Sequence, residues 1–247
     1  MSGHIFGQLG WNVRAVGDEV HGEAVVIAPL LVPGAERLRV SVLAAWADHL
    51  MGLVAAQIVT PRVPATLELD VQLLESAPST GRVRGRGRLL KSGRTVVFAA
   101  CDFYDARDRR FAIAGGSFML AGDPNVRLPA KLSLDLPDQP AVLTVPFAER
   151  AGCTLREPGV AVLERHEDGL NSANTISGGL LALAAEEALR SRYEAQTLCS
   201  LALRYLRPCR VGPAVAIAER HGTLGMVEIR DEGSDARLAV VGSARVS

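Results

Sequence analysis

The chain has 247 residues, 48% of them apolar, and its 27 basic side chains are balanced by 27 acidic ones. This length suits two domains of ordinary size, with enough apolar residues for packed cores. The charge balance gives no support to a nucleic acid or an anionic membrane as the partner. The four cysteines have neither paired nor histidine-interleaved spacing, so we expect no metal and no cofactor.

The first half of the chain predicts strands around one long helix. Residues 8–30 alternate as a strand does, with Gly17 and Gly22 as turn points. An apolar helix is predicted from about residue 38 to residue 58, before Pro61. Strand-like segments follow near residues 66–74, 81–90, 95–104 and 111–120. A single long helix followed by such strands indicates an α+β fold.

The predicted helix is apolar enough to suggest a membrane span, yet Asp48 and His49 lie at its centre. An ionised group is expensive in lipid, so we expect a helix buried by protein and no membrane insertion. Residues 1–7 lack the basic and apolar pattern of a signal peptide. We therefore expect a cytoplasmic location with reduced thiols.

An alternating basic run extends from Arg82 to Arg88, with Val83, Gly85 and Gly87 between the arginines. The favoured interpretation is the solvated face of a strand. The alternative is a patch for the nucleotide phosphates of a CoA-type ligand.

Proline-rich residues 121–145 are interpreted as a linker, because few of them keep any period. The order of elements then repeats, with a strand at 160–165, a loop at 171–177 and a helix at 178–193. Strands are predicted at 197–205, 214–220, 225–230 and 237–245. We predict an N-terminal repeat at residues 1–120 and a C-terminal repeat at residues 146–247.

The two predicted helices can be aligned through their first turns. Placing Ser177–Gly179 on Arg39–Ser41 brings Glu186 onto Asp48, at an offset of 138 residues. Each repeat is therefore built around a helix with one carboxylate near its middle.

The pair Gly178-Gly179 stands at a predicted helix start, where backbone N–H groups have no partner within the helix. The helix dipole adds to their positive potential, and glycine lets a ligand approach the backbone. Such a start suits a carbonyl oxygen that becomes negative during a reaction. The structural alternative is a hinge, with Asn171 and Asn174 as turn and cap residues.

Seven residues separate Gly179 from Glu186, which puts them about 10 Å apart on one helix. Both groups cannot touch one small reacting centre at that distance. We therefore expect the helix start of one repeat to work with the carboxylate of the other. Two antiparallel helices at a pseudo-twofold interface would bring Asp48 to Gly178 and Gly179.

The stretch from Asn171 through Thr175, Gly178 and Gly179 to Glu186 resembles the helix-entry motif of hotdog-fold acyl-CoA thioesterases of the phenylacetyl-CoA thioesterase-like group. Residues 203–208 and 47–52 also resemble parts of that family. The resemblance implies a tandem double hotdog. In it each long central helix is wrapped by a curved antiparallel sheet, and the repeats pack as an intrachain pseudo-dimer with sites at their interface.

The departures from the motif divide the machinery between the repeats. Ser177 stands in place of its His and Glu186 in place of its Asp. In the first repeat Asp48 keeps the acid, while Arg39–Ser41 replace His-Gly-Gly and Pro33 replaces the Asn.

The resemblance therefore implies one intact composite site. Its catalytic residues are Asp48, Asn171, Gly178 and Gly179, with Thr66, Ser177 and Thr197 as substrate-binding residues. A second, degenerate site pairs Glu186 and Thr197 with the region around Ser41, and we expect it to be impaired.

The expected reaction is hydrolysis of an acyl-CoA or acyl-carrier thioester, with Asp48 as general base or nucleophile. One alternative is a non-catalytic acyl-CoA binding module. Another is a hydratase or dehydratase of the same fold, although its Asn-Pro-x-His loop is not found. We also expect a homo-oligomer, a dimer of double hotdogs.

Overall fold

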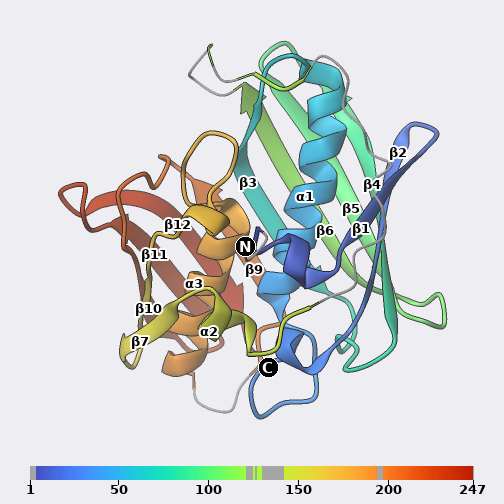
Figure 1. Cartoon of the computed structure of the whole chain (residues 1–247). Helices are drawn as coiled ribbons and strands as arrows, with labels where there is room; N and C mark the ends of the chain where they lie inside the picture. The colour runs from blue at the N-terminus through green and yellow to red at the C-terminus, as the bar shows by residue number, and fades with distance from the viewer. Residues whose placement is uncertain (1–3, 121–124, 126, 130–141, 194–196, 247) are drawn as a thin grey trace.

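The computed structural model describes residues 4–120, 125, 127–129, 142–193 and 197–246. These residues form a 12-stranded antiparallel sheet with the order β1-β2-β4-β5-β6-β3-β9-β12-β11-β10-β8-β7. Two long helices, α1 (Val40–Val59) and α3 (Gly178–Arg192), each pack on one half of this sheet (Figure 1). The expected α+β class is confirmed.

The strands of the first half surround α1, and those of the second half surround α3. The first half contains η1 (Gly7–Leu9), β1 (Asn12–Val16), β2 (Glu19–Val25), η2 (Ala28–Leu30), β3 (Pro64–Leu73), β4 (Arg82–Ser92), β5 (Val96–Tyr104) and β6 (Arg110–Leu120). The second contains α2 (Phe147–Arg150), β7 (Cys153–Glu157), β8 (Val160–Leu163), η3 (Glu167–Gly169), β9 (Ser200–Tyr205), β10 (Ala214–His221), β11 (Leu224–Asp231) and β12 (Arg237–Arg245).

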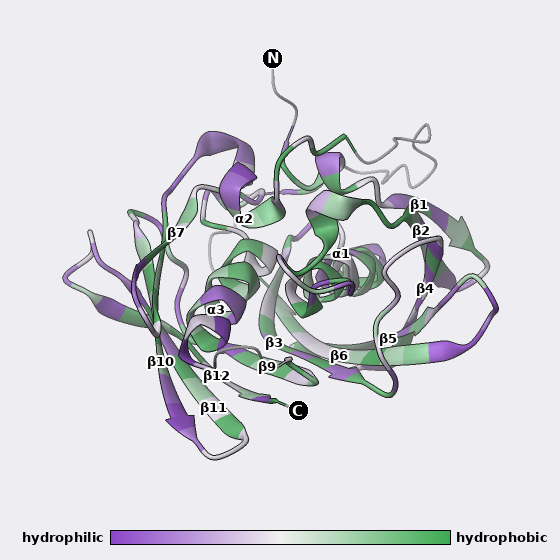
Figure 2. Ribbon diagram, turned by 90° about the horizontal axis from the view of Figure 1, so that it is seen from below, coloured by the Kyte–Doolittle hydropathy of each residue, from purple (hydrophilic) through white to green (hydrophobic). Residues whose placement is uncertain are grey.

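The two halves of the sheet join where β3 pairs with β9, from Glu68 opposite Arg204 to Gln72 opposite Ser200. In each half, the strand at this seam is the first strand after the long helix: β3 follows α1, and β9 follows α3. Figure 2 shows α1 and α3 in the curve of the sheet, with β3 and β9 beneath them. The repeat boundaries remain a prediction, because most of residues 121–145 lie outside the described residues.

Helix α1 is apolar because protein covers most of its surface. Its length and composition would suit a membrane span, but 61% of the most apolar stretch of this helix is buried inside the fold. Trp46 is buried and stacks on Trp11, with ring centroids 4.5 Å apart. Burial by protein therefore explains why this helix has so few polar residues, as expected from the sequence.

Strand β4 explains the alternating arginines. Its inward residues are small enough for α1 to lie close to the sheet: a Cβ on Gly85 would stand 2.9 Å from Leu50. The outward arginines contact acidic or aromatic side chains: Arg82 with Glu23, Arg84 with Asp108, Arg88 with Asp102, and Arg86 over Tyr104. These contacts favour the solvated strand face over a phosphate patch.

Several sequence predictions need correction. Gly17 lies in a turn, but Gly22 lies inside β2, where its missing side chain makes room for Trp11. Helix α1 begins at Val40 because Arg39 is still extended, with φ −65° and ψ 142°. Helix α2 and strand β7 were not predicted, and their few residues carry too little periodicity to reveal them.

Gly22 provides a test of this packing. A Cβ built on it would lie 2.3 Å from the Trp11 ring, which is held in its stack on Trp46. We expect Gly22→Ala to lower the free energy of unfolding by about 1–3 kcal/mol, because the added methyl group would displace the Trp11 ring or the backbone of β2. Urea unfolding measures this change.

Gly115→Ala is the matched control, since a Cβ on that strand glycine meets no atom within 4 Å. Equal effects of the two substitutions would contradict the assignment of Gly22 to the tryptophan contact.

Candidate active site

Asp48 lies near the middle of α1 and is partly buried. The hydroxyl of Thr66, at the start of β3, donates a 2.8 Å hydrogen bond to its Oδ1. Burial raises the pKa of Asp48 to about 6, and the bond from Thr66 offsets part of that effect. The helix thus holds a carboxylate that changes protonation close to neutral pH.

The start of α3 faces this carboxylate. A Cβ built on Gly178 would lie 3.3 Å from Asp48 Oδ2. A Cβ on Gly179 would lie 2.8 Å from the Cβ of Ala45, so the two helices touch at this point. At Gly179 only a residue without a side chain permits this approach. The first N–H groups of α3 and the carboxylate of α1 therefore border the same space.

Tyr205, the last residue of β9, completes this group, and the sequence did not single it out. Its hydroxyl donates a 3.0 Å hydrogen bond to the carbonyl oxygen of Gly178. Burial, and then the nearby Asp48 charge, raise the pKa of Tyr205 well above its usual value. The phenol therefore stays protonated and able to donate. The sequence could not predict this contact, because the alternation of a strand shows which face a tyrosine is on but not which helix it contacts.

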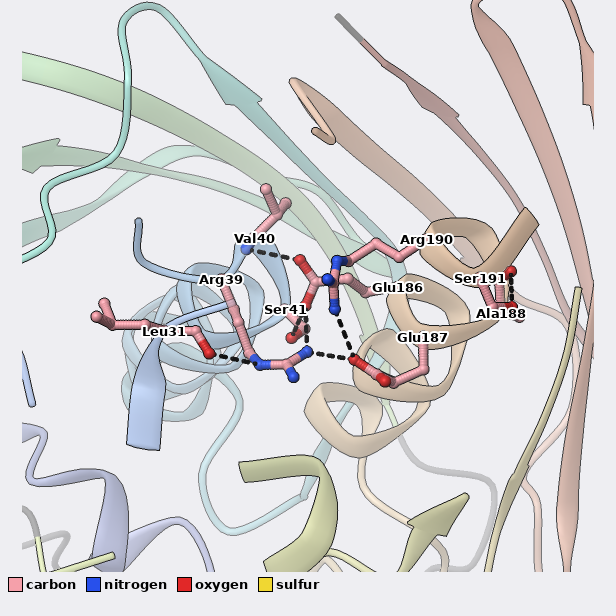
Figure 3. A network of polar contacts seen from close by, with 9 residues as sticks. All are labelled: Leu31, Arg39, Val40, Ser41, Glu186, Glu187, Ala188, Arg190 and Ser191. Carbon is pink, nitrogen blue, oxygen red and sulfur yellow. Dashed lines mark hydrogen bonds and ion pairs between the residues drawn. The ribbon is translucent and has the colours of Figure 1, made fainter. Parts of the chain in front are cut away.

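The second carboxylate, Glu186 of α3, has a different environment (Figure 3). It is 1% exposed and accepts a 3.0 Å hydrogen bond from the Val40 N–H, at the start of α1. The Ser41 hydroxyl donates a second bond at 2.5 Å, and Arg39 Nη1 a third at 3.3 Å. Glu186 therefore occupies the helix start that a ligand would need.

Arg39 is fully buried between the two helices. Its Nη1 also donates to Glu187, and its Nε donates to the Leu31 carbonyl oxygen at 3.2 Å. Figure 3 shows the guanidinium between the loop before α1 and the carboxylates of α3. Arg39 aligns with Ser177, so one half has a buried cation where the other half has a neutral hydroxyl.

The comparisons with known proteins bear on the fold that carries these residues. Residues 41–112 match the model of the thioesterase superfamily. The search of curated proteins gave no match. An acyl-ACP thioesterase from Bacteroides thetaiotaomicron superposes with a TM-score of 0.65 and 14% identity, over 93% of this chain and 98% of that one. The chain has the hotdog fold of the thioesterases.

Two more hotdog structures span nearly the whole chain. The tesB protein of Mycobacterium avium subspecies paratuberculosis gives a TM-score of 0.62 at 14% identity, covering 98% of this chain and 96% of that one. The 12:0-ACP thioesterase of Umbellularia californica gives 0.62 at 11% identity, covering 95% and 99%. These likenesses establish the hotdog fold along the chain.

Within this hotdog fold, the remaining predicted residues have other surroundings. Asn171 is exposed, and its Oδ1 accepts hydrogen bonds from the N–H groups of Ala173 and Thr175. These are turn contacts, which favour the structural alternative for this residue. Ser177 is the buried N-cap of α3, and its Oγ has no hydrogen-bond partner among the described residues. Thr197 lies with Glu186 beside a cavity.

The loops that enter the two helices also differ in length. Leu31 bridges to Leu38 and Leu170 bridges to Ile176, so the first loop has one more residue. Val32 therefore takes the place of Asn171, and the assignment of Pro33 to that position is corrected. An alignment without a gap cannot detect this insertion.

The pKa of Asp48 predicts a pH-dependent cost to the fold. Its value of about 6 in the folded protein exceeds the value near 4 of an exposed aspartate. The folded state therefore keeps this proton between pH 4 and 6 after the unfolded chain has lost it. Stability falls as pH rises through this window, because the ionised form is disfavoured in the fold.

We expect Asp48→Asn to remove this cost. The variant should be more stable than the wild type by about 1–3 kcal/mol at pH 8, and the gain should vanish near pH 4. Urea unfolding at both pH values measures it, with the exposed Asp18→Asn as control. A gain of equal size at both pH values would show that the Asp48 charge is not its source.

Proposed function

We propose that this protein hydrolyses an acyl-CoA or acyl-carrier thioester at a composite site formed by Asp48 of α1 and the start of α3. One observation carries the proposal: Asp48 Oδ2 stands 3.3 Å from the Cβ position of Gly178, although 130 residues separate them. A carboxylate that faces free helix N–H groups offers a base and an oxyanion site at one place. The thioesterase match of residues 41–112 supports this choice of reaction.

In the proposed mechanism the thioester carbonyl oxygen lies at the N–H groups of Gly178 and Gly179. These donors and the dipole of α3 stabilise the negative charge that develops on that oxygen. Asp48 takes a proton from water, and the resulting hydroxide adds to the carbonyl carbon. Collapse of the tetrahedral intermediate breaks the carbon–sulfur bond. The thiolate takes up the proton held by Asp48, which restores the carboxylate, and the free acid and thiol leave.

The environment of Asp48 suits the role of base. A pKa of about 6 leaves most of the carboxylate ionised at neutral pH, while making it a stronger base than an exposed aspartate. Thr66 fixes its orientation through the bond to Oδ1, which leaves Oδ2 toward the start of α3. Glu186 lacks this freedom, because three donors bind its two oxygens.

Tyr205 acts on the oxyanion site through the backbone. The Gly178 carbonyl, which accepts its hydrogen bond, belongs to the same peptide unit as the Gly179 N–H. A bond to the carbonyl end polarises the unit and strengthens its N–H as a donor. We therefore assign Tyr205 as a positioning residue and not as a group that touches the thioester.

The central test compares the two carboxylates. We expect Asp48→Asn to lower kcat by about 100- to 10,000-fold, the usual range for loss of a general base. Glu186→Gln should retain turnover in the fraction of molecules that circular dichroism shows to be folded. The assay measures the free thiol that hydrolysis releases from short-chain, long-chain and aromatic acyl-CoA substrates.

The pH profile gives a second readout. In the wild type kcat/KM should rise with pH through about 6, as Asp48 ionises. Wild-type turnover in Asp48→Asn together with its loss in Glu186→Gln would reverse the assignment. Binding of acyl-CoA without hydrolysis over the whole panel would instead identify a non-catalytic module.

The role of Tyr205 makes a separate prediction. Tyr205→Phe should lower kcat by about 3- to 30-fold, less than the 100-fold or more that follows loss of a direct oxyanion donor. KM should stay unchanged, because the hydroxyl does not touch the substrate. Steady-state kinetics provide the measurement.

Tyr104→Phe on β5 is the matched control and should leave both constants unchanged. A rise in KM at constant kcat in Tyr205→Phe would contradict the assignment, since it would place the hydroxyl at the substrate.

A further inference from the structure

A cavity of about 210 Å³ lies beside Glu186, on the side of the molecule that the proposed reaction does not use. It lies between the loop before α1, the end of β3, the residues leading into β9 and the second half of α3. At about 30 Å³ per water molecule its volume equals roughly seven waters, which suits a small organic ligand. By the alignment of Glu186 with Asp48, it is the counterpart of the space at the composite site.

Apolar side chains form part of the walls of this cavity. Leu38, Val40 and Leu198 are buried side chains that line it, and Leu73 of β3 adds a fourth. A ligand that enters it therefore gains from placing an apolar segment against these residues.

The charged residues lining the cavity are Arg37, Glu186 and Arg190. The Glu186 carboxylate is already bound by Val40, Ser41 and Arg39. These donors, among them the Arg39 guanidinium, offset the negative charge of Glu186 at the cavity.

The positive charges exceed the negative ones. Glu187 contacts both Arg39 and Arg190, so Arg39 and Arg190 share the two carboxylates of α3 (Figure 3). Arg37 has no ion pair among the described residues and is half-buried at the cavity. The buried Nη2 of Arg39 also lacks a hydrogen-bond partner there. One positive charge at the cavity thus remains without a counter-charge.

We propose that this cavity binds a small monocarboxylic acid with an apolar chain. Its carboxylate lies at Arg37, with Arg190 at the same wall, and its chain lies against Leu38, Leu73 and Leu198. An arginine matches a carboxylate in geometry as well as in charge. One uncompensated positive charge favours a monoanion, and the leucines of the lining favour an anion with an apolar chain over inorganic phosphate. The site is a binding site only, because its own carboxylate is engaged by the helix start.

Isothermal titration calorimetry with sodium hexanoate at pH 8 tests this site without any thioester present. We expect hexanoate to bind at least about 10-fold more tightly than 1-hexanol, which lacks the charge, and than phosphate, which lacks the chain. Arg37→Gln should weaken hexanoate binding by about 10-fold or more, the loss expected for a charge-assisted hydrogen bond. Ala35→Phe, which fills the cavity from its loop, should also weaken it.

Two variants locate the bound acid. The exposed Arg14→Gln is the matched control and should bind hexanoate as the wild type does. Asp48→Asn should also leave the affinity unchanged if the acid lies beside Glu186. A change in Asp48→Asn with none in Arg37→Gln would place hexanoate at the composite site and overturn the proposal. Equal binding of phosphate, or no binding of hexanoate, would overturn it too, whatever the outcome of the thioesterase assay.

Discussion

The buried bond between Glu186 and the start of α1 determines how the two halves of the molecule meet. A carboxylate without water needs donors, and here a helix N–H, a hydroxyl and a guanidinium supply them. Loss of one partner from such a buried pair typically costs about 3–5 kcal/mol. The bond fixes one end of α1 against α3. Two turns further along α1, Asp48 stands opposite Gly178, next to the contact between Ala45 and Gly179.

The two carboxylates occupy aligned helix positions but have different physical roles. Glu186 has one more methylene group than Asp48, and its oxygens bond directly to the facing helix start. Asp48 accepts a bond from Thr66, and burial leaves its pKa near 6. A carboxylate that is fully bound stabilises an interface, whereas one that is desolvated and only partly bound retains the capacity to react. The two carboxylates thus occupy equivalent positions on their helices but have different surroundings.

Close packing of small residues makes this arrangement possible. Gly85 lets α1 lie against β4, and Gly178 and Gly179 let α3 approach α1. Tyr205 then reaches the Gly178 carbonyl from the seam of the sheet. The seam, the helix contact and the candidate site are therefore parts of one packed unit.

The sequence by itself determined the α+β class, both long helices and most strands, and it singled out Asp48, Thr66, Gly178 and Gly179 as candidate site residues. These follow from local periodicity, from helix-start chemistry and from resemblance to a known motif. Only the tertiary structure decided the burial of Arg39, whose partner Glu186 is 147 residues away, and the contact of Tyr205 with Gly178. It also moved Gly22 from a turn to the Trp11 contact and gave Asn171 turn contacts. Alternation along a strand tells which residues share a face. The neighbour that a side chain meets depends on how distant segments pack, and no local pattern records that.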